Sequence, residues 1–418
     1  MTAGLAGAVG LSATACGGGD QVADDVVLKL VAAEYGDASD SGSTERYWNE
    51  LAQEFRQEHS GIRVDVSVFP WEDIDAEVAG LVRAGQSPDI AQLGSYADFA
   101  AAGQLYPVSE LLSIPVQADF VPALAVAGEV RRVQYGMPFA ASTRLLFYNK
   151  ALFEDAGLDP KAPPETWEEL AEAAAALKAA GVPVPYALPL GPEEAHGEAL
   201  MWMLSGGGGL TDGSGSYVID SPENVATFTW LRENLVAKGL TGSQAPAVTD
   251  RRDAFAAFAA GEVGMLNGHP SLMRQADRGQ IEYGTGRLPG RNGPTANTMG
   301  VADWIMGFKQ HGNREQIGLF LNFVFRKENV QGFADRYEML PVTTPATQAM
   351  MESEEHERVV PFLQQLNAAA FYPVGKVSWA KTSTVLRQEI GSAMLPDSDI
   401  RGLLRSIQVQ AEKADDAA

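Results

Sequence analysis

The stretch YGMPFAASTRLLFYNKALFEDAGL, residues 135–158, places two strand-like apolar runs directly before a helical segment. The next segment, PPETWEELAEAAAALKAAG at residues 163–181, begins with two prolines, followed by Thr166 and Glu169 in the spacing of a capping box. We therefore expect a pair of strands, a helix and then a well-capped second helix in the centre of the chain. Strands that lead directly into amphipathic helices indicate an α/β fold.

The N-terminal quarter of the chain alternates in the same way. Strand-like residues 26–33 and 62–70 flank a segment that carries Trp48, Leu51 and Phe55 at helical spacing. Another helical segment and a short apolar strand follow before residue 95. This order predicts a parallel sheet with right-handed crossover helices.

The rest of the chain continues this alternation, and residues 350–410 are predicted to be mostly helical. The sequence has no internal repeat of fixed period, which argues against a solenoid. Its 418 residues are long enough for about two domains.

Composition narrows the class of protein. Hydrophobic residues make up 45% and charged residues 20%, as in soluble globular proteins. The 31 basic and 54 acidic residues give a net charge of −23, which repels phosphate backbones and argues against nucleic-acid binding. A single cysteine excludes an internal disulfide framework and any cysteine-rich metal site.

The first residues read as an export segment. Residues 1–15 are small, apolar and uncharged, and they end in Ala-Thr-Ala immediately before Cys16. The run up to residue 26 is rich in Gly and Asp and suits a tether. Together these features resemble the lipobox of bacterial lipoproteins, although Ala13 stands where that motif usually has Leu. We expect residues 1–15 to be a signal peptide, Cys16 to be lipidated and residues 16–26 to form a lipid-anchored linker.

Five stretches, in order, are similar to one known family. They are WNELAQEFRQEHSGIRVDV (48–66), GQSPDIAQLGSYADFAAAGQLYPVSEL (85–111), the central stretch through WEEL (135–170), AFAAGEVGMLNGHPS (257–271) and GVADWIMGFKQHGNREQIGLFLNFVF (300–325). The family is that of the extracellular solute-binding proteins of bacterial ABC importers, family 1, the maltose-binding-like group. The resemblance covers residues 27–345.

The resemblance implies an α/β fold of the type II periplasmic-binding-protein kind, with two lobes, a hinge that the chain crosses three times and a ligand cleft between the lobes. We assign residues 27–140 and 298–342 to the N-terminal lobe, and residues 141–297 and 343–410 to the C-terminal lobe. The expected crossings lie near 140–142, 290–300 and 341–344. Ligand contacts with both walls exist only in the closed form, so binding shifts the population towards closure, and a membrane permease would recognise that form.

A sugar site needs flat aromatic rings for the apolar faces of the sugar and polar side chains for its hydroxyls. In open α/β sheets such residues follow the carboxyl ends of the strands. The resulting candidates for ligand binding are Tyr35, Asp37, Trp71, Tyr96, Asp98, Ser142, Arg144, His269, Asp303, Trp304, Arg336 and Tyr337.

Some of these candidates have alternative interpretations. Arg144 could form an interlobe salt bridge or donate to a ligand hydroxyl. Trp304 beside Asp303 suits a pyranose and is the expected ring platform. Other residues are assigned to helix surface or core: Glu194, His196, Trp202, Trp48, Trp167 and Trp230.

Catalysis finds little support in the sequence. It has no G-x-S-x-G, H-E-x-x-H, P-loop or EF-hand motif, and its five histidines lack metal-ligand spacing. We expect no enzyme activity, cofactor or metal. The expected protein is a monomer that is lipid-anchored to the outer face of the bacterial cytoplasmic membrane and delivers a mono- or oligosaccharide to an ABC permease. The alternatives are a non-sugar solute such as a polyol phosphate, polyamine or peptide fragment, a secreted carbohydrate-active enzyme, or an adhesion lipoprotein.

Overall fold

The computed structural model describes residues 25–36, 42–71 and 73–417. The predicted signal peptide, Cys16 and most of the tether lie outside these described residues, as does Asp37. Within the described ranges, no helix is both long enough and apolar enough to cross a membrane.

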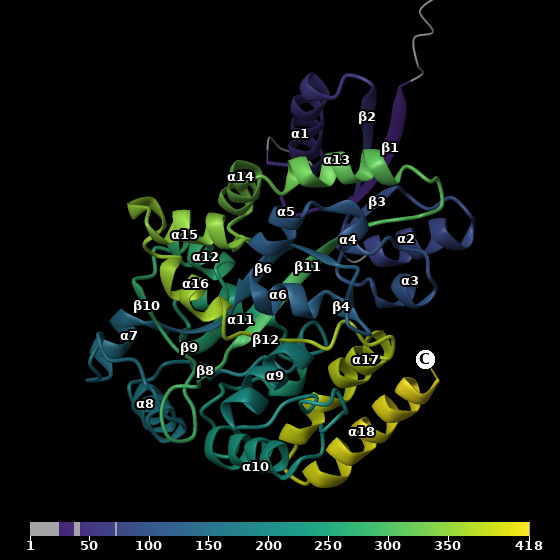
Figure 1. The fold of residues 1–418 in the computed structure, drawn as a ribbon. Coiled ribbons are helices and arrows are strands. Elements are labelled where there is room, and N and C mark those ends of the chain that lie inside the picture. Colours follow the sequence, from purple (N-terminus) through teal and green to yellow (C-terminus); the bar gives the residue numbers. More distant parts are fainter. Residues whose placement is uncertain (1–24, 37–41, 72, 418) are drawn as a thin grey trace, which may run out of the picture.

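One sheet forms the core of the first lobe, drawn uppermost in Figure 1. Its strand order is β12-β11-β3-β1-β2, and β6 also pairs with β11. β1 is parallel to both β2 and β3, which confirms the predicted parallel arrangement, whereas β11 is antiparallel to β3 and β6. The strands are β1 Val26–Ala33, β2 Ile62–Phe69, β3 Ile90–Leu93, β6 Met137–Thr143, β11 Met299–Gly307 and β12 Ala370–Phe371.

Helices cover both sides of this sheet. α1 packs against β2, and α2 packs against β1 and β3. A short hairpin, β4 Glu129–Val130 with β5 Val133–Gln134, lies beside α3. The helices of this lobe are α1 Thr44–Glu58, α2 Ile74–Arg83, α3 Ala97–Ala101, α4 Val108–Leu111, α5 Ile114–Asp119, α6 Pro122–Ala127, α13 Arg314–Val324 and α14 Lys327–Tyr337.

A second sheet, of order β10-β7-β9-β8, forms the core of the other lobe. Its strands are β7 Leu145–Asn149, β8 Val184–Ala187, β9 Val263–Gly268 and β10 Tyr283–Gly286. The helices of the remaining segments are α7 Lys150–Asp155, α8 Trp167–Ala179, α9 Ala195–Ser205, α10 Pro222–Leu231, α11 Arg251–Ala259, α12 Ser271–Arg278, α15 Thr344–Met351, α16 Val360–Leu366, α17 Trp379–Glu389 and α18 Ile400–Asp416. Short helical turns occupy Arg232–Val236, Pro246–Val248, Glu354–His356 and Ile390–Met394.

Local sequence explains where the main helices begin and what they bury. The predicted capping box at α8 is confirmed, because the Thr166 hydroxyl accepts from the Glu169 amide and the Glu169 carboxylate accepts from the Thr166 amide. In α1, Trp48 and Phe55 are fully buried. Trp167 is also buried, which confirms its assignment to the core, and Trp230 packs partly buried against it.

The hinge lies where the two sheets meet. β6 of the first sheet ends at Thr143 and β7 of the second begins at Leu145, so only Arg144 separates them. The Arg144 carbonyl accepts from the Thr298 hydroxyl at 2.7 Å, and the backbone of Leu340 pairs with that of Ala141. Three segments distant in the sequence therefore meet here, as expected of three crossings.

Two expected lobe limits need correction. The first sheet extends through Thr143, three residues beyond the predicted limit at residue 140. β12 lies within the range 343–410 assigned to the C-terminal lobe, but it pairs with β11 in the first sheet. Backbone hydrogen bonds at the hinge thus include residues 141–143 and β12 in the first sheet, although the sequence pattern assigns them to the other lobe.

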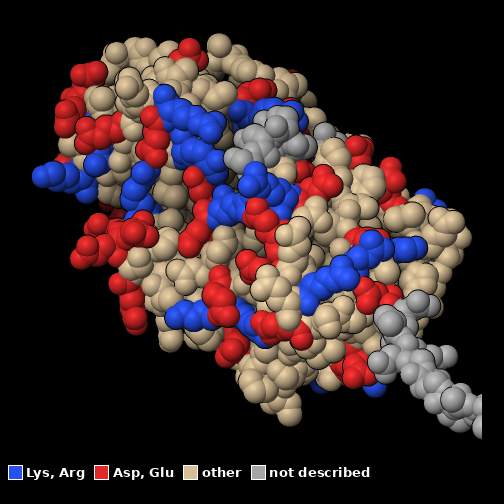
Figure 2. Space-filling view, turned by 90° about the horizontal axis from the view of Figure 1, so that it is seen from above, with Lys and Arg blue, Asp and Glu red and all other residues tan. Residues whose placement is uncertain are grey.

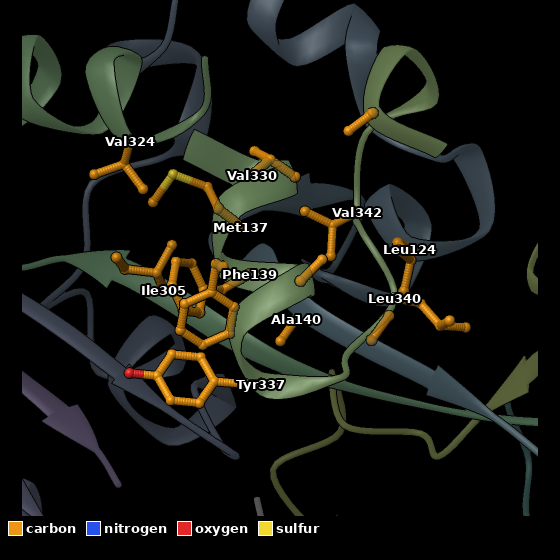
Figure 3. Close-up of a cluster of buried hydrophobic side chains, with 14 of the residues drawn as sticks. Leu124, Met137, Phe139, Ala140, Ile305, Val324, Val330, Tyr337, Leu340 and Val342 are labelled. Atoms are coloured by element: carbon orange, nitrogen blue, oxygen red, sulfur yellow. The ribbon is translucent and has the colours of Figure 1, made fainter. Parts of the chain in front are cut away.

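The crossing segments continue into the apolar core of the first lobe (Figure 3). Phe139 of β6 stacks on Trp48, with ring centroids 5.1 Å apart, and also meets Phe333 at 4.4 Å. Leu340 and Val342 of the third crossing are fully buried in the same cluster. Burial of these side chains fixes the hinge strands to the first lobe.

Charges of both signs intermingle on the face seen from above in Figure 2. Ion pairs at this end include Arg326 with Glu58 at 2.7 Å, and Arg336 with Glu50 at 2.9 Å. Among the described residues of this face, basic side chains lie next to acidic ones.

Gly300 is required by close packing at the hinge. A Cβ at this position would lie 2.5 Å from the Phe371 ring of β12.

We expect Gly300→Ala to displace β12 and lower the free energy of unfolding by about 1–3 kcal/mol, measured by denaturant titration. Gly332→Ala on the open face of α14 is the control, since a Cβ there meets nothing within 4 Å. It should be neutral or stabilising by up to about 1 kcal/mol, and equal destabilisation by both variants would contradict the packing argument.

Candidate functional site

A cavity of about 430 Å³ lies between the two lobes. This volume is within the range of about 300–1,000 Å³ typical of small-molecule sites. The first lobe contributes residues of α2, the β3–α3 connection and β11, and the second contributes residues of α9, the segment after β12 and α17. The polar and aromatic side chains that line it are Asp75, Ser95, Asp98, Asp303, His196, Tyr372, Lys376, Trp379, Ser383, Thr384 and Arg387.

A chain of hydrogen bonds positions Asp303 on the first-lobe wall. The Tyr35 hydroxyl donates to Asp303 Oδ2 at 2.6 Å and accepts from Gln92 Nε2 at 2.8 Å. Gln92 Oε1 accepts in turn from the Ala33 amide at the end of β1. Burial raises the pKa of Asp303 to about 7, so this carboxyl group changes charge near neutral pH.

Two other predicted residues lie on the same side. Asp98 of α3 lines the cavity, and burial raises the pKa of its carboxyl group while Lys381 of the opposite lobe acts to lower it. Trp71 is 37% exposed and meets the Tyr35 ring edge-on at 5.3 Å. A Cβ on the cavity-lining Gly94 would lie 3.9 Å from the Trp71 ring, which places Trp71 at the rim.

Three stacked aromatic rings form the second-lobe wall. Tyr372 lies parallel to His196 at 4.9 Å and to Trp379 at 5.0 Å. The Tyr372 hydroxyl and His196 Nδ1 are buried and have no hydrogen-bond partner among the described residues. Burial lowers the pKa of His196 to about 4, so its ring is neutral at pH 7. Since buried polar atoms are normally hydrogen-bonded, the lack of a partner for these two atoms is an unusual feature of two residues that line the cavity.

A network of ion pairs supports this wall from behind. Glu194, which precedes α9, pairs with both Arg144 and Arg251, and Arg251 also pairs with Glu193 at 2.8 Å. Burial acts to raise the pKa of Glu194, but the two guanidinium groups outweigh it and the pKa is lowered. His269 lies within 3.2 Å of Arg251. Arg144 therefore forms a salt bridge, but its partner Glu194 belongs to the second lobe, so the pair is not the interlobe salt bridge that one interpretation expected.

The structure brings only part of the predicted set to the cavity. Asp98 and Asp303 line it, Tyr35 holds Asp303, and Trp71 stands at the rim. The residues Ser142, Arg144 and His269 belong to the hinge and the supporting network, since Ser142 Oγ accepts from Arg144 at 2.9 Å.

Four predicted contacts are corrected by the structure. Trp304 is 1% exposed and packs on Tyr96, which is fully buried, at 5.3 Å in the first-lobe core, so neither ring presents a face to the cavity. Arg336 pairs with Glu50 on α1, and Tyr337 packs beside Phe333. Neither of these two lines the cavity between the lobes.

Sequence reasoning missed most of the second-lobe wall. The sequence predicts only that the region of Tyr372, Trp379 and Arg387 is mostly helical, and it assigns His196 to helix surface or core. The available signal was the run FYPVGKVSW, residues 371–379, where aromatic residues flank a Pro and Gly turn. Their convergence with α9 depends on contacts between distant segments.

Comparison with known proteins identifies the class. The family model described as "Bacterial extracellular solute-binding protein" matches residues 41–331. The chain belongs to this family, as its sequence predicted, and it has the two-lobed fold of periplasmic binding proteins.

Individual relatives agree with this class. A putative binding protein of Brucella abortus (strain 2308) is 27% identical over 400 residues, covering 93% of each chain. The sn-glycerol-3-phosphate-binding periplasmic protein UgpB of Pectobacterium atrosepticum is 27% identical over 332 residues, covering 74% of this chain and 73% of that protein. Among solved structures, the cyclic alpha-maltosyl-1,6-maltose binding protein from Arthrobacter globiformis superposes with a TM-score of 0.77 at 19% identity, over 94% of this chain and 100% of the other.

Glu198, one turn beyond Glu194, gives the second lobe a pH-dependent stability. It is 3% exposed, and its Oε1 accepts from Trp202 Nε1 at 2.8 Å and from Asn267 Nδ2 at 3.1 Å. Burial raises its pKa to about 8. Because the folded pKa lies above that of the unfolded chain, the contribution of Glu198 to stability is fully present below the unfolded pKa and is lost as the pH rises from there through about 8.

We expect Glu198→Gln to abolish this loss. Relative to the unmodified protein it should match in stability near pH 5 and be more stable by on the order of 3 kcal/mol at pH 9, measured by chemical denaturation across pH. The exposed Glu172→Gln on α8 is the matched control and should leave the pH profile unchanged. A profile that Glu198→Gln does not flatten would show that this carboxyl group is not the one that titrates.

Proposed function

We propose that the protein binds a sugar or similarly polyhydroxylated solute between its lobes and delivers it to an ABC permease. The observation that carries the proposal is the second-lobe wall, where the Tyr372 hydroxyl and His196 Nδ1 lack partners beside stacked rings. Aromatic faces suit the apolar faces of a sugar ring, and the carboxyl groups of Asp98 and Asp303 on the opposite wall suit its hydroxyls.

Similar proteins support this choice of solute. The titles of structures with the same fold name bound maltose in one from T. maritima and alpha-D-tagatose in one from Thermotoga lettingae, at 20% and 19% identity. The second title also calls its protein an ABC transporter solute-binding protein. The family and its named relatives are binding proteins, and we propose no catalytic step for this chain.

The two walls lie on different lobes, so a solute that binds both of them would favour closure of the lobes. A solute that touches both Asp303 and Tyr372 makes its full set of contacts only when the lobes approach, so binding stabilises the closed form. Contacts between strands at Arg144, Thr298 and Leu340 form the hinge for that movement. The closed form is the one that a permease would recognise.

The proposal also includes location and assembly. We propose that residues 1–15 direct export, that Cys16 carries a lipid on the outer face of the cytoplasmic membrane, and that the protein acts as a monomer. The sequence pattern around Cys16 supports the anchor, and the extracellular family supports the compartment.

Tyr372→Phe tests the site with a single atom. The hydroxyl is buried without a partner, so its removal should leave the ligand-free melting temperature unchanged or raised. Sugar affinity, measured by calorimetry with the best ligand from a panel of mono-, di- and trisaccharides, should fall about 3- to 10-fold.

Tyr148→Phe is the matched control for that experiment. The Tyr148 hydroxyl donates to the Pro160 carbonyl away from the cavity, so this variant should lose stability and keep its affinity. If Tyr372→Phe binds the sugar as tightly as the unmodified protein, the proposed wall is not the sugar site.

Cys16→Ser tests the anchor in a bacterial host. Without the thiol no lipid can be attached, so the protein should move from the membrane fraction to the soluble extracytoplasmic fraction. Ser12→Ala, within the same segment, should remain membrane-bound. Retention of Cys16→Ser in the membrane would disprove lipid anchoring at this residue and leave the solute site untouched.

A further inference from the structure

Charge is divided unequally between the two walls of the cavity. The first lobe presents the carboxyl groups of Asp75, Asp98 and Asp303. The second presents Arg387 beside the hydroxyl-bearing residues Ser383 and Thr384 on α17. A bound solute therefore meets hydrogen-bond acceptors on one side and donors with a positive charge on the other.

Arg387 differs from the other arginines near the cavity. Arg144 and Arg251 are neutralised by Glu193 and Glu194. Arg387 is half-buried, and no carboxylate of the described chain lies within ion-pair distance of it; its hydrogen bond is to Thr384 Oγ1 at 3.5 Å. A guanidinium withdrawn from water gains most from an anionic partner.

The neighbours of Arg387 show where this residue lies in the cavity. Ser383 lies four residues before it on α17, so the two side chains share one face of the helix. The Arg387 charge also acts on Tyr372 and His196, the residues whose buried polar atoms lack partners. The Arg387 guanidinium, the hydroxyl-bearing side chains of α17 and the Tyr372 side chain thus line the same cavity.

We propose that Arg387 binds an oxyanion group of the solute, so that the ligand is a polyhydroxylated acid rather than a neutral sugar. This inference rests on the proposed function of the same cavity and narrows its substrate class. The planar guanidinium donates two parallel hydrogen bonds to a carboxylate or a phosphate. The hydroxyls of the same solute then face the carboxyl groups of the first lobe, which accept hydrogen bonds from them.

The division of charge also fixes the orientation of the ligand. An oxyanion at the first-lobe wall would meet Asp98 and Asp303 and be repelled once they ionise. Only the orientation with the acidic group towards α17 avoids this repulsion. Arg387 of α17 therefore determines the preference for an acid, and the charges of the two walls together determine how the ligand is oriented.

Paired probes, each an acid and its neutral parent polyol or sugar, test the inference. Dissociation constants are measured by calorimetry for D-glucuronate against D-glucose, and for sn-glycerol-3-phosphate against glycerol. At least one acid should bind at least tenfold more tightly than its neutral partner, as expected for a charge-assisted pair worth about 1.5–3 kcal/mol. A response to glucuronate alone assigns a carboxylate ligand, and a response to glycerol-3-phosphate alone assigns a phosphate ligand.

Two variants test whether Arg387 is the source of the preference for an acid. Arg387→Gln should remove the preference for the acid, so that the ratio of the dissociation constants of the acid and its neutral partner falls to about one. Arg401→Gln on α18 is the matched control, because it removes the same charge from an exposed position that does not line the cavity. It should retain the full preference, and circular dichroism should show both variants folded.

The outcomes separate this inference from the function on which it rests. Neutral sugars that bind as tightly as the acids, or an acid preference that survives Arg387→Gln, would overturn the inference and leave the sugar-binding proposal standing. If neither the acids nor a broad panel of neutral saccharides binds, the result counts against both proposals.

Discussion

The ion pair between Arg144 and Glu194 is the interaction on which the cleft depends. Arg144 is the single residue between the last strand of one sheet and the first strand of the other, and it is 4% exposed. A charge at that depth is stable only because Glu194 pairs with it at 3.1 Å and Ser142 accepts a second hydrogen bond. Since Glu194 directly precedes α9, the pair holds the His196 wall at a defined position relative to the hinge.

The two walls divide the tasks of recognition between them. On the first lobe, a hydrogen-bonded chain from the end of β1 through Gln92 and Tyr35 aims Asp303 at the cavity. On the second lobe, rigid rings offer contact area at low conformational cost, and Tyr372 adds a hydroxyl without a partner. Each wall offers a different kind of contact, so the proposed coupling of solute binding to lobe closure depends on both walls.

The fold was largely predictable because its signals are local. Capping at Thr166 and the apolar face of α1 depend on residues three or four positions apart, and both were predicted correctly. The site depended on which side of a strand each residue faces. Asp303 and Trp304 are adjacent on β11, where neighbours point to opposite faces and the ladder is irregular between them, so one lines the cavity and the other joins the core. The sequence pattern does not indicate which, and the stacking of Tyr372 on His196 joins segments with no shared sequence signal.

The segment that begins at β12 serves both lobes. Residues 370–387 complete the first sheet at Phe371 and then supply Tyr372, Trp379 and Arg387 to the opposite wall. The region that marks the chain as a solute-binding protein ends at residue 331, before this segment begins. One wall of the cavity is therefore supplied by residues beyond the segment that the family model matches, and the same short segment ties that wall to the sheet of the opposite lobe.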